Sequence, residues 1–295
     1  MPDVTPPSTI GVLGFGAMGA GVAWALRTQG FDVATCVTDR SAATQARAKA
    51  GDVVQCPDLA ALVARSDTFL SIVPADQAIP LAESVMACCS GRERPLHYVD
   101  CNSITPRKTE AIAALIAHGG GVFTDAGIIG PPPAPNRNAT RFYTSGPHRA
   151  VLNSLATPEM QMLPLGEALT EATQMKVLFA GINKGTVALL MNVLAAAQRA
   201  NLSDAVMAEV DSMRPGLLDV ARRPVRELSG KAARWSLEME DIAEALEDLG
   251  CDGGYHAAAA KGYRRLAEQS VSSDIGESSL PEMLHQLLAR WPRRA

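Results

Sequence analysis

The chain of 295 residues carries a formal net charge of -4, and 47% of its residues are hydrophobic against 20% that are charged. This length predicts two domains, and the apolar share excludes an intrinsically disordered protein. Because no dense block of Lys and Arg occurs, we expect neither nucleic acid nor a membrane as a partner, and a small-molecule ligand is favoured.

The N-terminal residues and the cysteines bear on where the protein works. Residues 1–8 are proline-rich and acidic, and we expect no apolar stretch near the roughly 20 residues of a membrane span, so a cytoplasmic protein is favoured. The six cysteines lack Cys-x-x-Cys spacing, and we expect reduced thiols and no metal site. A redox switch at Cys88 and Cys89 is the alternative.

From residue 9 to about residue 125, short β-branched runs alternate with alanine-rich helical segments. This alternation is typical of βαβ units and a parallel sheet. The expected strands are Thr9–Leu13, Asp32–Cys36, Asp67–Ile72, His97–Asp100 and Val122–Asp125. Doubly wound sheets bind ligands beyond the carboxyl ends of their strands, so the loops that follow these strands are the expected site.

Beyond residue 165 the sequence predicts helices. The expected helices are Glu167–Ala200, Ser203–Met213, Gly216–Val220, Trp235–Leu249 and Tyr255–Gln269. The first of them is expected to be one long helix, although Gly181 and Gly185 are unfavourable residues within a helix. The predicted fold class is an α/β Rossmann domain over residues 1–165, followed by an all-α domain over residues 166–295 that serves substrate binding and dimerisation.

The first strand leads into a glycine-rich turn and then into a helical segment, residues 20–29. Gly14 permits a tight turn, Gly16 lets the backbone approach a pyrophosphate, and Gly19 lets the helix pack against the strand. The helix N-terminus offers unpaired N–H groups to the phosphates. The turn therefore predicts a dinucleotide site, with cofactor contacts at Gly14, Phe15, Gly16, Ala17, Met18 and Gly19.

The loop after the second strand, Asp39-Arg40-Ser41, is expected to meet the adenosine ribose. Asp39 could accept hydrogen bonds from a 2′-hydroxyl, as NAD requires, whereas Arg40 and Ser41 could bind the 2′-phosphate of NADP. NADP(H) is favoured and NAD(H) remains open. Asp39 as a turn residue and Ser41 as a helix N-cap would be compatible with either cofactor.

The glycine turn resembles the Gly-Leu-Gly-x-Met-Gly opening of the β-hydroxyacid dehydrogenase family, which includes 3-hydroxyisobutyrate and 6-phosphogluconate dehydrogenases. Ser71-Ile72-Val73-Pro74 resembles the family loop beside the nicotinamide, and the segment 99–106 resembles its Asp-x-Ser-Thr-x-x-Pro motif. The resemblance implies cofactor contacts at Val73, Pro74 and Asn102 and a substrate contact at Ser103.

The segment Thr124–Pro131 falls where the family has Asp-Ala-Pro-Val-Ser-Gly-Gly, a loop that holds the substrate carboxylate. The resemblance implies substrate contacts at Gly127, Ile128 and Ile129. Ile129 takes the place of the family's serine, which leaves the usual small hydroxyacid substrate open. A rigid turn without a ligand is the alternative.

The segment Gln174–Gly185 resembles the family's catalytic helix, and Lys176 matches its catalytic lysine. Phe179 and Ala180 stand where members have Asn or His-Asn. We expect Lys184 on the same face of the helix and His256 at the substrate pocket. A solvated helical lysine is the alternative for Lys176.

The resemblance implies hydride transfer between a nicotinamide and a carbonyl or alcohol carbon, with Lys176 as acid/base. The C-terminal region resembles a branch whose second domain is phosphogluconate-dehydrogenase-like, and homodimers are common in the family. One alternative is an imine reductase, although such members generally lack the lysine. Another is a non-catalytic NADP sensor, since the asparagine after Lys176 is missing.

Overall fold

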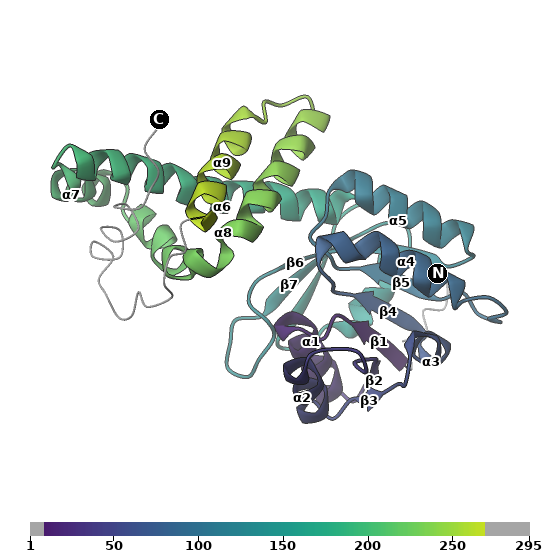
Figure 1. Cartoon of the computed structure of the whole chain (residues 1–295). Helices are drawn as coiled ribbons and strands as arrows, with labels where there is room; N and C mark the ends of the chain where they lie inside the picture. Colours follow the sequence, from purple (N-terminus) through teal and green to yellow (C-terminus); the bar gives the residue numbers. More distant parts are fainter. Residues whose placement is uncertain (1–8, 269–295) are drawn as a thin grey trace. The chain divides into compact units, whose positions relative to one another are not determined.

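The computed structural model describes residues 9–268 and is drawn in Figure 1. The described residues divide into two compact units, with the boundary between Lys176 and Val177. The division falls inside a long helix, and the boundary expected from the sequence, at residue 165, lies shortly before that helix.

The first unit is built on one eight-stranded sheet with the order β3-β2-β1-β4-β5-β6-β7-β8. Neighbouring strands are parallel apart from β6 and β7, which are antiparallel. This arrangement confirms the predicted Rossmann-type domain. The strands are β1 (Thr9–Leu13), β2 (Asp32–Thr35), β3 (Val54–Gln55), β4 (Thr68–Ser71), β5 (His97–Asp100), β6 (Val122–Ile129), β7 (Thr140–Ser145) and β8 (Met160–Pro164).

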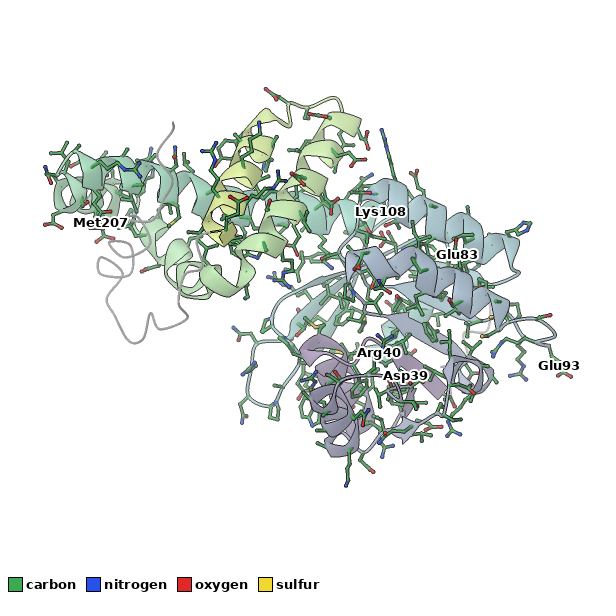
Figure 2. All side chains as sticks on the ribbon, in the orientation of Figure 1. Asp39, Arg40, Glu83, Glu93, Lys108 and Met207 are labelled. Atoms are coloured by element: carbon green, nitrogen blue, oxygen red, sulfur yellow. The ribbon has the colours of Figure 1, made fainter. Side chains whose placement is uncertain are left out.

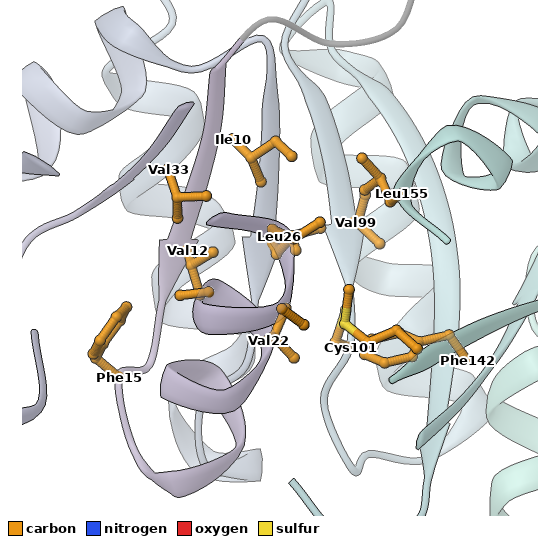
Figure 3. Packing of buried hydrophobic residues seen from close by; sticks show 14 of the residues in the cluster. Ile10, Val12, Phe15, Val22, Leu26, Val33, Val99, Cys101, Phe142 and Leu155 are labelled. Atoms are coloured by element: carbon orange, nitrogen blue, oxygen red, sulfur yellow. The ribbon is translucent and has the colours of Figure 1, made fainter. Parts of the chain in front are cut away.

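Helices cover both faces of this sheet. The elements between the strands are α1 (Ala17–Thr28), α2 (Ala42–Ala50), α3 (Leu59–Arg65), η1 (Ala75–Gln77), α4 (Ala78–Ala87), α5 (Pro106–His118) and η2 (Arg149–Leu155). Helix α1 and η2 pack on one face, where Val22 and Leu155 meet strand residues such as Val99 (Figure 3). Helices α3, α4 and α5 pack on the other face, and Figure 1 shows α4 and α5 side by side there. Successive strand residues alternate between the two cores, as the pleat requires.

The end of β6 differs from the prediction. The sequence placed a loop after Asp125, but β6 continues to Ile129 because its second half pairs antiparallel with β7. Ile128 and Ile129 are buried within the strand. The glycines at 127 and 130 and the prolines that follow suggested a turn, and they concealed this extension. The short β3 and the strands β7 and β8 were not predicted.

The second unit contains the remainder of α6 (Glu171–Arg199) together with α7 (Ser203–Met213), α8 (Leu217–Asp248) and α9 (Gly254–Glu268). The prediction of two separate helices at 216–220 and 235–249 was wrong, because α8 is continuous over 32 residues. From Leu228 onward its buried residues recur every three or four positions, which gives this part of the helix one apolar face. They are Leu228, Ala232, Trp235, Met239 and Ile242.

Glycines on α6 let α9 approach closely. A Cβ at Gly181 would lie 3.2 Å from the His256 ring, and one at Gly185 would lie 3.2 Å from the Tyr255 ring. The Tyr255 hydroxyl donates a 2.6 Å hydrogen bond to the Gly185 carbonyl, and the Tyr263 hydroxyl donates one of 2.7 Å to the Lys184 carbonyl. The glycines therefore serve helix packing, and α6 is continuous through them, as the predicted single long helix requires.

Helix α6 is also an exception to the expectation that no apolar stretch approaches membrane-span length. Over its 29 residues it is long and apolar enough to cross a membrane by length and composition, and 44% of its most apolar window is buried within the protein. Core helices of water-soluble proteins satisfy the same two criteria, so this property alone does not indicate a membrane span.

Candidate functional site

Two glycines of the turn between β1 and α1 are required by the protein's own backbone. A Cβ at Gly14 would lie 2.0 Å from the carbonyl oxygen of Ile72, and this residue has a φ of +98°. A Cβ at Gly19 would lie 2.2 Å from the carbonyl oxygen of Gly14. The absence of side chains at Gly14 and Gly19 lets α1 lie close to the sheet. This is the point where the connections from β1 and β4 diverge, which is where doubly wound sheets bind ligands.

Gly16 is different, because no protein atom lies within 4 Å of the position that its Cβ would take. Gly16 is the N-cap of α1 and has no side chain to satisfy the helix's first N–H groups. Gly16 and Ala17 are both exposed. An open helix N-terminus with bare backbone is the arrangement that receives a phosphate, so the residues present fit the pyrophosphate of a dinucleotide.

The loop between β2 and α2 presents polar groups near this turn. Asp39 and Arg40 are exposed on it (Figure 2). The Ser41 hydroxyl accepts a hydrogen bond from the Thr44 N–H at 3.4 Å, so Ser41 is the N-cap of α2, as the alternative interpretation held. The N-cap geometry does not decide between NAD and NADP.

Arg47 lies on α2 next to this loop and was not predicted from the sequence. Its guanidinium donates to the Phe15 carbonyl at 3.2 Å and to the Thr44 hydroxyl at 3.1 Å, and the Thr44 hydroxyl lies 3.1 Å from that of Ser41. Ser41, the N-cap of α2, and Thr44 and Arg47 within α2 follow each other at intervals of three and are thus neighbours along the helix. That spacing was visible in the sequence.

The loops after β4 and β5 are joined by Asn102. Its side-chain amide donates to the Ser71 hydroxyl at 2.9 Å, and its Oδ1 accepts the Val73 N–H at 2.7 Å. Asp100, the last residue of β5, accepts the backbone N–H of Asn102 at 2.8 Å and its side-chain amide at 3.1 Å. Asn102 is thereby fixed on both its backbone and its side chain.

Asp125 lies beside Asp100 in the register of β5 and β6 and holds the start of α6. Its carboxyl accepts the Thr173 N–H and the Thr173 hydroxyl, each at 2.7 Å, and the Ser145 hydroxyl at 3.2 Å. The Ser145 hydroxyl in turn accepts the Ala172 N–H at 2.9 Å. N–H groups of the first helical turn that lack partners within the helix are thus satisfied.

Both carboxyls are almost entirely buried, and burial sets their acidity. Loss of solvation raises the pKa of Asp100 to about 6, against the opposing effects of its hydrogen bonds from Asn102 and the charge of Lys176. Loss of solvation likewise raises the pKa of Asp125 to about 7; the negative charge of Asp100 adds to this effect, while the hydrogen bonds from Thr173 and Ser145 oppose it.

Lys176 extends from the second turn of α6 to this polar group. Its ammonium donates to the main-chain carbonyl of Asn102 at 3.0 Å, and its side chain is half-buried. A Cβ at Gly127 would lie 2.4 Å from the Ala172 carbonyl and 3.2 Å from the Lys176 Cβ. The absence of a side chain at Gly127 therefore lets this part of α6 lie against β6.

The structure brings some predicted site residues together but not others. Lys176, Asn102, Val73 and Gly127 meet at the carboxyl ends of β4, β5 and the neighbouring part of β6. Ser103 and Pro74 are exposed beside them. The predicted substrate loop is instead strand, so the side chains of Ile128 and Ile129 belong to the protein's interior.

The remaining predicted residues, Lys184 and His256, lie in the second unit. The Lys184 ammonium forms an ion pair with Glu238 at 2.7 Å. At 100° per residue, the eight positions from Lys176 to Lys184 leave them about 80° apart around the helix, so the expected shared face was wrong. The His256 ring packs against Gly181, and its Nδ1 is buried without a hydrogen-bond partner among the described residues.

The described part of the chain, residues 9–268, contains no group of three or more His, Cys, Asp or Glu side chains placed to hold a metal ion. Its chemistry-bearing groups are instead an open helix N-terminus, a lysine ammonium and two buried carboxyls. The fold and these groups define a dinucleotide-binding protein of the Rossmann type.

Residues 9–157, half of the chain, match the family model described as the NAD binding domain of 6-phosphogluconate dehydrogenase. Residues 197–268 match a model described as a domain of unknown function (DUF1932). The chain belongs to the β-hydroxyacid dehydrogenase-like family, in which an NAD-binding domain is followed by a helical region. The family places it among nicotinamide-dependent oxidoreductases.

Solved structures agree with this assignment over nearly the whole chain. A conserved hypothetical protein from Sinorhizobium meliloti is 25% identical, with a TM-score of 0.72 and 96% of each chain covered. The 3-hydroxyisobutyrate dehydrogenase of Mycobacterium tuberculosis, solved with L-serine, is 18% identical, with a TM-score of 0.73 over 95% of this chain and 99% of that one. An imine reductase from Streptomyces aurantiacus is 19% identical, with a TM-score of 0.55 over 94% of this chain and 98% of that one. At these identities the last two likenesses are of fold.

The buried Asp125 carboxyl predicts an unusual pH dependence of stability. Because the pKa of Asp125 is raised in the folded protein, protonation of this carboxyl stabilises the folded state. This contribution to the free energy of unfolding is present at acidic pH and is lost as the pH rises through about 7. Asp125→Asn imitates the protonated form. We expect the variant's deficit in unfolding free energy, measured by urea denaturation, to be about 1 to 2 kcal/mol smaller at pH 8.5 than at pH 5.5. Asp58→Asn, at an exposed helix start, is the control and should show the same deficit at both pH values. A deficit for Asp125→Asn that does not change with pH would contradict the prediction.

Proposed function

We propose that the protein is an NADP(H)-dependent oxidoreductase that acts on a carbonyl or alcohol carbon, with Lys176 as its acid/base. One observation carries the proposal: the Lys176 ammonium is bound to the Asn102 carbonyl at the carboxyl end of β5. The same unit contains the open N-terminus of α1 at Gly16. A proton-transferring group and a dinucleotide cradle thus lie at the same edge of one sheet.

The preference for NADP rests on the polar groups after β2. Arg40 is exposed and available to form charge-assisted hydrogen bonds to a 2′-phosphate. Ser41 and Thr44 add hydroxyls, and Arg47 adds positive charge where its guanidinium meets the Phe15 carbonyl. Asp39 is the one carboxylate in this group, and it is also exposed, so it can turn away from a phosphate. NAD(H) binding through Asp39 is the alternative.

The chemistry assigned to Lys176 is proton transfer to or from the substrate oxygen. A bound nicotinamide supplies or accepts the hydride at its C4. Lys176 then has two tasks, which are to hold the substrate oxygen by hydrogen bonding and to move one proton as that oxygen changes between carbonyl and hydroxyl. The Asn102 carbonyl fixes the direction of the amine for both.

The substrate is proposed only as a class, a small hydroxyacid or its keto or aldehyde counterpart. The fold likeness to a 3-hydroxyisobutyrate dehydrogenase supports this class. The isoleucine at 129 does not, since it is buried and offers no hydroxyl to a carboxylate. Reduction of a C=N bond is the second candidate, favoured by the fold likeness to an imine reductase and opposed by the lysine at 176.

We also propose that the protein is a homodimer that uses an exposed apolar stripe on α6. Ile182, Leu189 and Val193 are 69%, 50% and 47% exposed. At 100° per residue, Leu189 and Val193 lie about 20° to either side of Ile182 around the helix. Soluble monomers rarely expose apolar stripes of this kind, and a second copy of the same helix would match this one in length and character.

The cofactor preference is tested by replacing Arg40. We expect the unmodified protein to bind NADPH more tightly than NADH in fluorescence titrations, and Arg40→Ser to weaken NADPH binding at least tenfold by removing a charged partner. NADH binding should not change. Arg137→Ser, which removes an exposed arginine elsewhere in the unit, is the matched control. An unmodified protein that prefers NADH would overturn the NADP assignment.

The role of Lys176 is tested with Lys176→Met, which keeps the length of the side chain and removes the amine. We expect turnover of NADPH with the best substrate from a panel of keto acids, aldehydes and cyclic imines to fall at least 100-fold, the range typical of a lost acid/base. NADPH affinity should remain within threefold. Lys261→Met, an exposed lysine of α9, is the control. NADPH binding without oxidation across the whole panel would instead favour a sensor.

The dimer is tested with Ile182→Glu, which places a charge at the most exposed position of the apolar stripe. We expect the unmodified chain to have twice the monomer mass in light scattering at micromolar concentration and the variant to have the monomer mass. Met213→Glu, at a methionine of α7 that is 61% exposed, should stay dimeric. A monomeric unmodified chain would count against the proposal.

A further inference from the structure

The side chain of Asn102 is occupied within the protein. Both hydrogens of its amide are used, one by the Ser71 hydroxyl and one by the Asp100 carboxyl. Its Oδ1 accepts the Val73 N–H. An amide so committed is poorly suited to contact a ligand directly, so the part it plays is to join the loop after β4 to the loop after β5.

The backbone of Asn102 has a second set of partners. Its N–H is bound by Asp100, and its carbonyl receives the Lys176 ammonium. The backbone of Asn102 therefore positions the Lys176 ammonium, and the side chain of Asn102 positions the Val73 N–H. Asn102 therefore positions both loops and the lysine.

Asp100 is the group that orients Asn102. Each of its carboxyl oxygens accepts one hydrogen bond from Asn102, one from the backbone and one from the side chain. Asp100 is 1% exposed and cannot exchange these donors for water. We propose that Asp100 is a positioning residue, which acts through Asn102 to fix both the Val73 turn and the Lys176 ammonium for the reaction proposed above.

An asparagine at position 100 could not replace this carboxyl. Its Oδ1 can accept one of the two hydrogen bonds, but its amide nitrogen is a donor and would face another donor on Asn102. A buried donor without an acceptor is costly, so Asn102 would have to move. Asp125 provides a matched comparison, because it is equally buried on the adjacent strand and its donors are Thr173 and Ser145 rather than Asn102.

The inference rests on the proposed function, but its first test needs no substrate. In the 15N-labelled protein without cofactor, the Val73 amide proton should resonate downfield because it is hydrogen-bonded to Asn102. In Asp100→Asn we expect this resonance to shift upfield by at least 0.5 ppm, on the order of the effect of losing a hydrogen bond. In Asp125→Asn it should stay in place. We call the action of Asp100 through Asn102 on Val73 and Lys176 the relay. If the Val73 resonance does not move in a folded Asp100→Asn variant, the relay is wrong.

The second test uses NADPH and a double-mutant cycle. We expect Asp100→Asn to weaken NADPH binding severalfold and, with a substrate from the panel, to lower kcat by about 10- to 100-fold with little change in KM, because misplaced groups slow the chemical step. Adding Asp100→Asn to Asn102→Ala should cost little further, since one acts through the other. Losses that multiply would show that Asp100 acts independently of Asn102 and overturn the inference.

Two controls keep the outcomes distinct. If Asp100→Asn fails to fold, Ser71→Ala removes the other acceptor of the Asn102 amide, and it should shift the Val73 resonance in the same direction by a smaller amount; no shift counts against the relay. If the unmodified protein binds no NADPH, the proposed function fails, whereas the Val73 resonances still decide the relay. If Asp100→Asn binds NADPH with unaltered affinity and has unaltered turnover, the relay is wrong, whereas the proposed function is not affected.

Discussion

The site depends on the burial of two carboxyl groups at the ends of neighbouring strands. A carboxyl that cannot reach water must be provided with hydrogen-bond donors by the protein, and those donors have to be held in place. Asp100 takes its donors from Asn102, and Asp125 takes its donors from Ser145 and the first turn of α6. The loop after β5 and the beginning of the lysine-bearing helix are fixed as a consequence. Their arrangement follows from a requirement of the fold, before any ligand is considered.

The glycines separate into those that serve the protein and those left for a ligand. Gly14 and Gly19 are required because their neighbours are backbone atoms, and Gly127 is required because α6 lies against it. Gly16 has no such neighbour, so folding alone does not account for it. From the sequence, Gly14, Gly16 and Gly19 of the turn were each expected to have a different role. The structure distinguishes them, and the single position without a protein contact is the one at the exposed helix N-terminus.

Much of the first unit could be predicted from the sequence because its signals are local. Five strands were expected near their observed positions, since each is a short β-branched run followed by turn residues, and the glycine turn lay in its expected context. The extension of β6 could not be predicted in the same way, because it depends on pairing with β7, which is itself stabilised by β8. The continuous α8 could have been predicted, since its apolar spacing runs through residues 228 to 242.

The site was predictable to the extent that it follows motifs. Lys176 and Asn102 were identified separately, but nothing in the sequence indicates that the lysine is bound by the main-chain carbonyl of Asn102, since main-chain acceptors leave no mark on residue identity. The proposed positioning role of Asp100 was not predictable for a similar reason. It depends on both carboxyl oxygens accepting hydrogen bonds from Asn102, one from its backbone and one from its side chain. Arg47 was not predicted because it lies on α2, beyond the loop in which the ribose contacts were expected, and its partner is the main-chain carbonyl of Phe15.

The departure of the chain from its family around the lysine has a physical consequence. Members resembling it have an asparagine side chain three or four residues after the lysine, and here Phe179 and Ala180 offer no polar group. An ammonium on a half-buried helix face still needs an acceptor, and the Asn102 carbonyl supplies it. In this chain the loop after β5 contributes to the orientation of the amine. Because that loop is held by a buried carboxyl rather than by solvent-exposed groups, the lysine is fixed by the sheet as well as by its own helix.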